Sequence, residues 1–83
     1  MKVQIEENLF IESDTHNFMI REYKTRNDGK AERVTTHGYF LSLAGAAKHL
    51  VKMKVKQSTA TTLQELVSDI QRIEEYIHSK ISL

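Results

Sequence analysis

The fold is decided by residues 18–40, which read FMIREYKTRNDGKAERVTTHGYF. Two runs rich in β-branched and aromatic residues, Phe18–Tyr23 and Arg33–Phe40, flank the polar segment Asn-Asp-Gly-Lys at positions 27–30. Such runs favour β-strands, and Asp-Gly supplies the positive φ that a tight hairpin turn requires. This stretch therefore predicts two antiparallel strands joined by a turn.

Two shorter runs of the same kind, residues 3–5 and 9–12, precede this hairpin. The polar cluster at residues 13–17 separates the second of them from Phe18, and side chains of this kind favour turns because they bond to nearby backbone amides. We therefore predict a three- or four-stranded antiparallel meander over about residues 2–40.

From Ser42 onward the apolar residues recur with helical spacing instead. A first helix is predicted over about residues 43–55, with Ser42 as its N-cap. Thr62 and Glu65 have the spacing of a capping box, which predicts the start of a second helix over about residues 62–81. The apolar residues of the second helix form a single stripe, made of Leu63, Leu66, Val67, Ile70, Ile73, Ile77 and Ile81.

These elements predict an α+β fold of the order β-β-β-α-α, in which both helices pack on one face of the sheet. The chain has 83 residues and contains no proline, internal repeat or low-complexity linker, so we predict one domain covering residues 1–83. Charged residues make up 28% and hydrophobic residues 40% of the chain, which is typical of a globular protein.

The absence of cysteine excludes both stabilising disulfides and a thiolate zinc site. The first residues turn acidic at Glu6 and Glu7, where a signal peptide would be apolar. No apolar run approaches the ~20 residues of a bilayer span. We therefore expect a cytoplasmic protein without a membrane partner.

Catalysis would need a nucleophile, an acid–base pair, a phosphate-binding loop or a metal cluster at workable spacing. The three glycines are dispersed at positions 29, 38 and 45 and form no nucleotide-binding loop. The four histidines lack the paired spacing of metal ligands. Asp14 and His16 lie in the turn-forming cluster, which favours a structural role for both. We predict a protein that is not an enzyme and has no cofactor or metal.

The net charge of +1 conceals a basic middle, because residues 21–56 hold nine Lys or Arg against three acidic residues. Such a region fits the phosphates of a nucleic acid or the acidic surface of a protein, and an ordinary solvated face is the alternative. The candidate binding residues belong to the hairpin and the first helix: Arg21, Tyr23, Lys24, Arg26, Lys30, Arg33, Thr35, Lys48, Lys52 and Lys56.

The aromatic residues of the strands suggest a related hypothesis. On an open sheet face they could stack on exposed bases, and the alternative is packing within the core or across strands. These residues are Phe10, Phe18, Tyr23, Tyr39 and Phe40.

The second helix has nearly the heptad spacing of a coiled-coil seam. Its distal residues Ile73, Ile77 and Ile81 are therefore candidates for self-association as a homodimer. The alternative is that the stripe packs on the chain's own sheet and first helix.

Four segments in succession, residues 8–14, 17–20, 38–40 and 62–66, resemble those of small uncharacterised proteins carried by phages and prophages of Gram-positive bacteria. The resemblance covers nearly the full chain and implies a genomic setting, with the host cytoplasm as location. In that setting small accessory proteins often bind host machinery, DNA-processing enzymes or anti-phage defence components.

A narrower likeness covers about residues 18–50, which are similar to the sheet-and-helix DNA-binding domains at the N-termini of phage-type integrases. The shared features are the hairpin turn, the strand that ends at Gly38-Tyr39-Phe40 and the helix that follows. The likeness implies insertion of the sheet into a major groove, with contacts from Arg21, Tyr23, Arg26, Arg33 and Thr35. The chain departs from that pattern by lacking a recombinase body and by adding the second helix.

We therefore expect a small phage-type accessory protein that binds a macromolecular partner. The leading hypothesis is a host protein that it inhibits or modulates, such as a defence or DNA-processing factor. The alternative is a DNA-binding module that uses the basic hairpin and the helix lysines, and a structural oligomer is the third interpretation.

Overall fold

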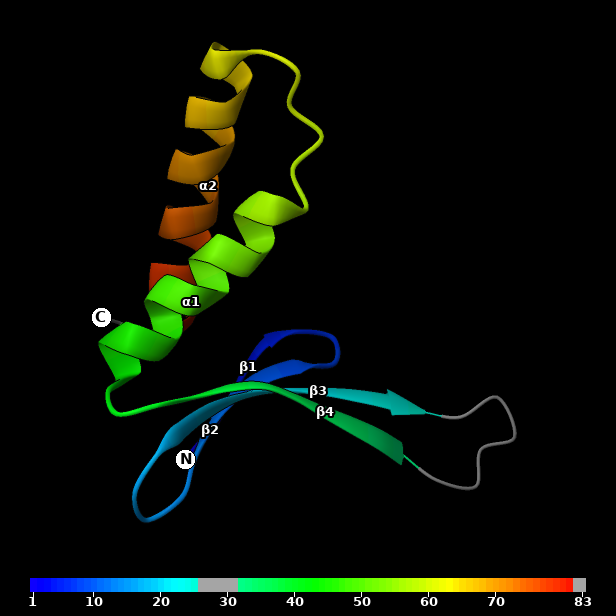
Figure 1. Ribbon diagram of the computed structural model, residues 1–83, viewed down its shortest axis with the longest axis vertical. Helices are drawn as coiled ribbons and strands as arrows, with labels where there is room; N and C mark the ends of the chain where they lie inside the picture. The colour runs from blue at the N-terminus through cyan, green and yellow to red at the C-terminus, as the bar shows by residue number, and fades with distance from the viewer. Residues whose placement is uncertain (26–31, 82–83) are drawn as a thin grey trace. The chain divides into compact units, whose positions relative to one another are not determined.

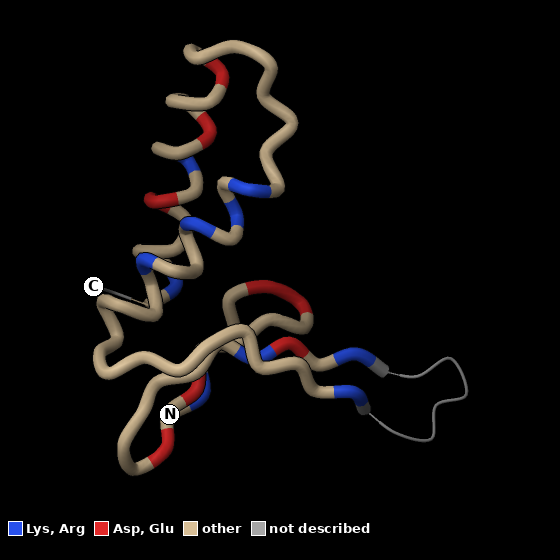
Figure 2. The backbone as a smooth tube through the Cα atoms, viewed as in Figure 1, with Lys and Arg blue, Asp and Glu red and all other residues tan. Residues whose placement is uncertain are grey.

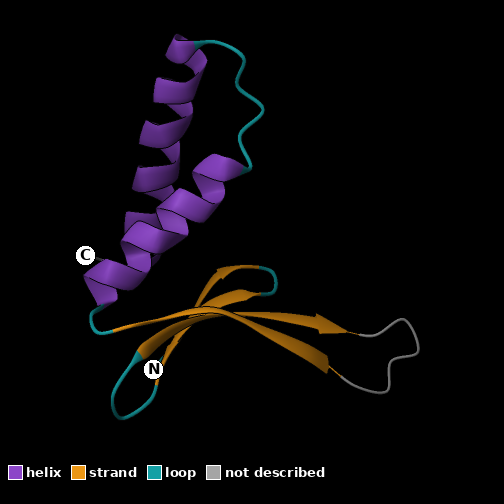
Figure 3. Ribbon diagram, in the orientation of Figure 1, coloured by secondary structure: helices purple, strands orange, loops and turns teal. Residues whose placement is uncertain are grey.

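The computed structural model describes residues 1–25 and 32–81 (Figure 1). The elements occur in the order β1 (Lys2–Glu6), β2 (Leu9–Ser13), β3 (Phe18–Thr25), β4 (Glu32–Phe40), α1 (Leu43–Lys56) and α2 (Leu63–Ile81). The strands form one antiparallel sheet in the order β1-β2-β3-β4 (Figure 3). The predicted α+β class is confirmed, with four strands in the meander and two helices after it. The predicted Asp-Gly turn lies outside the described residues.

The chain divides into two compact units. Residues 1–46 form the first, called the sheet unit because it contains all four strands, together with the first four residues of α1. Residues 47–83 form the second, called the helical unit, which contains the rest of α1 and α2. The expectation of a single domain stays a prediction, and each unit is described by itself.

The strand register determines which side chains share a face of the sheet, because residues directly opposite each other project on the same side. One row across all four strands consists of Val3, Ile11, Ile20 and Gly38. Ile11 and Ile20 are fully buried, and Leu9, which projects on the same side from β2, is nearly so. We call this side the buried face.

The opposite side of the sheet is called the second face. One row across it consists of Lys2, Glu12, Met19 and Tyr39. Strand alternation adds the neighbouring residues of the same strands, so that the second face comprises Lys2, Gln4, Phe10, Glu12, Met19, Arg21, Tyr23, Val34, Thr36 and Tyr39.

A bulge interrupts β4. Ile20 is opposite Gly38, whereas the next residue of β3, Arg21, is opposite Thr36, so His37 is the extra residue. A Cβ atom at position 38 would lie 2.7 Å from Cζ of Phe40, which shows that the Phe40 ring covers the glycine. A larger residue at position 38 would therefore require the Phe40 ring to move.

Local capping explains where both helices begin. The Gly45 N–H donates to Ser42 Oγ at 3.0 Å, which confirms Ser42 as the N-cap of α1. The Glu65 N–H donates to Thr62 Oγ1 at 3.2 Å, and Glu65 Oε2 accepts from the Thr61 N–H at 2.9 Å. The Thr62 half of the predicted capping box is therefore present at the start of α2, whereas the Glu65 carboxylate reaches back to the amide of residue 61 instead of that of the N-cap residue.

Ser58 attaches the connection between the helices to α2. Its hydroxyl donates to Asp69 Oδ2 at 2.5 Å and accepts from the Ala60 N–H at 3.1 Å. These bonds lie within the helical unit and hold the connecting segment against the second turn of α2.

Neither described helix has the length and apolar content needed to cross a bilayer.

Candidate binding surfaces

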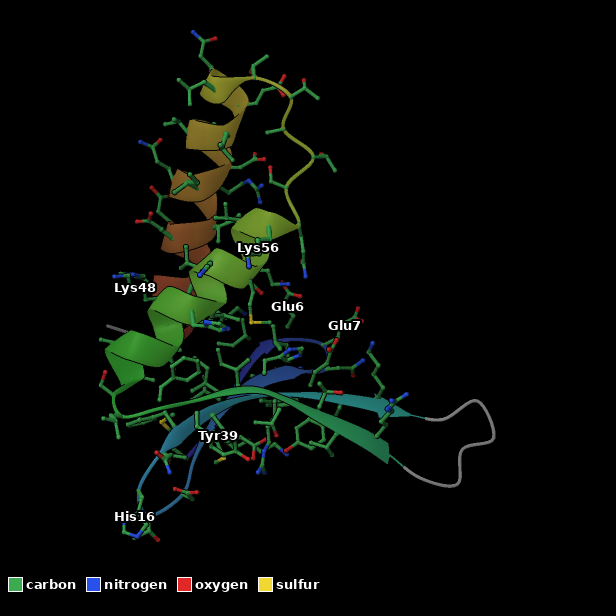
Figure 4. The ribbon with its side chains drawn as sticks, in the orientation of Figure 1. Glu6, Glu7, His16, Tyr39, Lys48 and Lys56 are labelled. Carbon is green, nitrogen blue, oxygen red and sulfur yellow. The ribbon has the colours of Figure 1, made fainter. Side chains whose placement is uncertain are left out.

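Helix α1 carries a row of lysines. Lys48, Lys52 and Lys56 are exposed and repeat every four residues, so they lie along one side of the helix about 6 Å apart. The helix sequence, LAGAAKHLVKMKVK, contains no acidic residue (Figure 2). We call these three residues the lysine row, and the side chains at its two ends are labelled in Figure 4.

Helix α2 of the same unit has the opposite character. Its exposed charged residues include Glu65, Glu74 and Glu75, together with Arg72, which forms an ion pair with Asp69 at 3.3 Å. The helical unit therefore combines one helix that is purely basic with one that is mainly acidic (Figure 2).

The hairpin of β3 and β4 separates the predicted basic residues onto two faces. Lys24 and Arg33 are directly opposite each other, both exposed, on the same side of the sheet as the pair Glu22 and Thr35. Arg21 lies on the second face. The predicted contact set therefore does not form one surface, because neighbouring residues of a strand alternate between its faces.

Arg21 is engaged within the second face. Its Nη1 lies 3.6 Å from Glu12 Oε1, and the Tyr23 hydroxyl donates to the other oxygen of the same carboxylate. Desolvation lowers the pKa of Arg21, but hydrogen bonding to Tyr23 and the charge of Glu12 outweigh it, so that the pKa is raised overall. Arg21 is therefore held in a polar cluster, which reduces its availability to a partner.

Two aromatic rings of the second face are covered as well. Phe10 and Tyr23 meet edge to face with centroids 5.4 Å apart and an interplanar angle of 86°. The Lys2 ammonium lies 4.8 Å from the Phe10 centroid and 4.5 Å from the Tyr23 centroid, which is cation–π geometry. These contacts favour the packing interpretation for both rings. Tyr39 is 64% exposed, although its side chain is hydrogen-bonded to Arg21 (Figure 4).

Sequence reasoning missed the roles of Lys2 and Glu12 on the second face. Their contacts depend on the register of β1 against β2, which places Lys2 opposite Glu12. The alternation of Phe10 and Glu12 along one strand was the available signal, because it puts an aromatic ring and a carboxylate on the same side.

The remaining predicted residues fall in three places. The lysine row belongs to the helical unit, whereas Lys24, Arg33 and Thr35 belong to the sheet unit. Arg26 and Lys30 lie outside the described residues.

The distal half of α2 does not present its stripe to the surface. Ile73 and Ile77 are buried and Ile81 is half-buried, although we predicted them as the self-association residues. The exposed apolar side chains of the stripe are Leu63 and Val67, in the first two turns. The physical reason is that a continuous stripe shows which side of a helix is apolar but not how much of that side is covered.

No group of three or more His, Cys, Asp or Glu is placed to share a metal ion in residues 1–25 and 32–81. Comparison with known proteins found no matching family model, no similar curated protein and no similar solved structure. The likenesses to phage accessory proteins and to integrase domains therefore stay predictions.

Proposed function

We propose that the protein is a non-enzymatic binding module that uses the lysine row of α1 to attach to an acidic surface of a partner protein. The observation that supports this proposal is the set of three exposed ammonium groups on one side of a helix that has no carboxylate. Charges of one sign arranged in this way attract a surface of opposite sign and orient it before contact.

The number of charges favours a protein over a nucleic acid. Each phosphate neutralised contributes a slope of about −0.9 to the salt dependence, so three lysines give about −2.7 and only weak attachment to duplex DNA. The exposed Glu65, Glu74 and Glu75 of the same unit would also repel a polyanion. A protein surface with patches of both signs can complement both helices.

The resemblance to phage accessory proteins supports a bacterial host factor as the partner, which the chain would inhibit or modulate. Tagged wild type and the variant Lys48→Glu/Lys52→Glu/Lys56→Glu are used to capture proteins from a nuclease-treated lysate of a Gram-positive host. The control Lys24→Glu/Arg33→Glu reverses two exposed charges of the sheet unit instead. A partner retained by wild type and control, and lost from the triple variant, is the expected result. Equal retention by the triple variant would contradict the proposal.

The hairpin supports a second candidate function, DNA binding, through one observation. Lys24 and Arg33 are directly opposite in the register, and like charges in that position destabilise a sheet unless an anion lies between them. Titration with duplex DNA at two salt concentrations tests this candidate. Salt-sensitive binding that is lost in Lys24→Glu/Arg33→Glu supports it, and no binding at low salt removes it.

A further inference from the structure

Strand β4 is an edge of the sheet, and it pairs with β3 alone among the described strands. The Tyr23 N–H donates to Asn8 O, so the peptide groups of Tyr23 point toward β2. Because these directions alternate along a strand, the peptide groups of Glu22 and Lys24 point toward β4. The peptide groups of their partners in β4, Thr35 and Arg33, point toward β3. The peptide groups of the residues between those partners point away from β3, toward the open edge of the sheet.

The residues of β4 whose peptide groups point to the open edge are Val34, Thr36 and Tyr39. Their side chains lie on the second face of the sheet. Val34 is 48% exposed and Tyr39 is 64% exposed. Natural edge strands are commonly protected by lysine, proline, other charges or a β-bulge; residues 34–40 contain no Lys, Arg, Asp, Glu or Pro, and the bulge at His37 is a protective feature of this edge. This edge therefore combines open backbone groups with exposed apolar side chains.

We infer that β4 pairs with β4 of a second copy of this chain, antiparallel and about a two-fold axis at Thr36. In this register each Val34 lies opposite Tyr39 of the other copy, which joins a β-branched and an aromatic side chain on the same face. The sheets of the two copies become one continuous sheet of eight strands.

The bulge at His37 makes the edge self-complementary. Val34 and Tyr39 are five residues apart, so in a regular strand they would project on opposite faces and could not be paired by a two-fold axis. The extra residue places both on the second face with outward peptide groups. The same register sets Thr35 opposite Gly38 of the other copy, and both residues belong to the buried face.

Charge does not oppose the pairing. Arg33, the one charged residue of this strand with a described side chain, lies opposite Phe40 of the other copy in the proposed register. The two Arg33 residues stand at opposite ends of the seam, about 20 Å apart, which exceeds the Debye length of about 8 Å at physiological salt. An extended peptide of another protein is the competing occupant of this edge.

Cysteine crosslinking tests the register, because the natural chain has no cysteine. Hydrogen-bonded partners in an antiparallel pair have Cα atoms about 5.5 Å apart, within disulfide range. We expect an oxidised equal mixture of Val34→Cys and Tyr39→Cys to form a covalent dimer. Either variant alone should crosslink weakly, because its two cysteines would be at least about 13 Å apart. Equal crosslinking of Val34→Cys alone, or none in the mixture, would overturn the register.

Sedimentation over about three decades of concentration, up to ~1 mM, tests the pairing itself. Val34→Lys should weaken self-association by about tenfold or more, because two cross-strand pairs are lost per dimer. Val67→Lys on α2 is the matched control, since Val67 is 47% exposed and Val34 is 48% exposed. The double variant Val34→Lys/Tyr39→Glu should recover association, because each lysine then faces a glutamate.

Two outcomes would overturn the inference. A wild type that stays monomeric at ~1 mM excludes the second copy, and binding of an extended peptide by that monomer assigns the edge to the competing occupant. Loss of association in Val67→Lys, with Val34→Lys unchanged, assigns the interface to α2. Reversal of the lysine row leaves sedimentation unchanged if β4 is the interface, so this inference and the proposed function can fail separately.

Discussion

Replacement of Glu12 by Gln tests whether the second face is a packed polar cluster. The Glu12 side chain is 13% exposed, accepts the Tyr23 hydroxyl and lies 3.6 Å from Arg21 Nη1. Arg21 Nε is buried and has no hydrogen-bond partner in the described residues, so the guanidinium depends on this carboxylate for compensation. The amide keeps the shape of the side chain but removes its charge.

The expected cost follows from the two contacts. A hydrogen bond to a charged group contributes about 1.5–3 kcal/mol, and an amide retains part of it, so Glu12→Gln should lower the free energy of unfolding by about 1–2 kcal/mol. Tyr23→Phe should cost about 1 kcal/mol, because the carboxylate keeps Arg21. Both single variants disturb the same hydrogen bond between Tyr23 and Glu12, so the double variant should cost less than the sum of the two single variants. The expected coupling energy is about 1 kcal/mol.

Urea denaturation followed by circular dichroism gives the free energy of unfolding of the wild type, the two single variants and the double variant. The matched control is Glu7→Gln, an exposed carboxylate at the turn between β1 and β2, which should change the free energy of unfolding by less than about 0.5 kcal/mol (Figure 4). Additive effects of Glu12→Gln and Tyr23→Phe, or a neutral Glu12→Gln, would refute the reasoning.

Three further predictions concern other parts of the fold. Gly38→Ala should cost about 1–3 kcal/mol because its Cβ would meet the Phe40 ring, and Phe40→Leu in the same chain should recover part of that cost; equal losses in the single and double variants count against the close approach. Ile77→Ala should cost about 2–5 kcal/mol in urea denaturation because Ile77 is fully buried, and a loss under 1 kcal/mol would show that the site is open. The hydrogen bond from Ser58, and after it the hydrogen bond and charge of Arg72, lower the pKa of Asp69 in the folded protein from 3.8. The ionised Asp69 carboxylate therefore contributes its full stabilisation of the folded state above pH 3.8, and this contribution is lost as the pH falls through the lowered pKa of the folded protein. Asp69→Asn should therefore flatten the acid limb of a plot of Tm against pH, and an unchanged limb would contradict that role.

The order of elements and both helix starts could be predicted because their signals are local. Ser42 caps α1 through an amide three residues away, and Thr62 does the same for α2. Such contacts are encoded by spacing alone. The antiparallel meander follows in the same way from short strand runs separated by polar turn residues.

The placement of the candidate binding residues could not be predicted, because it depends on register. One extra residue at His37 decides which side chains of β4 share a face with Arg21, and that bulge accompanies the packing of Phe40 over Gly38. The isolated glycine at position 38 was the available signal, because Gly inside a strand often marks a bulge, but it does not tell at which residue the register shifts. A shift of one residue exchanges the two faces, so hairpin residues that look contiguous in sequence are divided.

The apolar stripe of α2 shows the same limit for a helix. Its spacing predicts the apolar side, but Ile77 is buried while Leu63 is exposed on the same stripe. Coverage depends on packing partners that are distant in sequence, and periodicity contains no information about them.

The two proposed surfaces support each other energetically, although they lie in different units. A row of three lysines attaches weakly to any single acidic surface, because exposed charge pairs contribute about 0–1 kcal/mol each. Two copies joined through β4 carry two such rows in one particle, and attachment of the first row makes attachment of the second intramolecular. Against a partner that repeats its acidic surface, this linkage can raise the overall affinity by about 10²–10⁴ without any new contact. Pairing of the edge strand would therefore convert a weak electrostatic surface into an effective one.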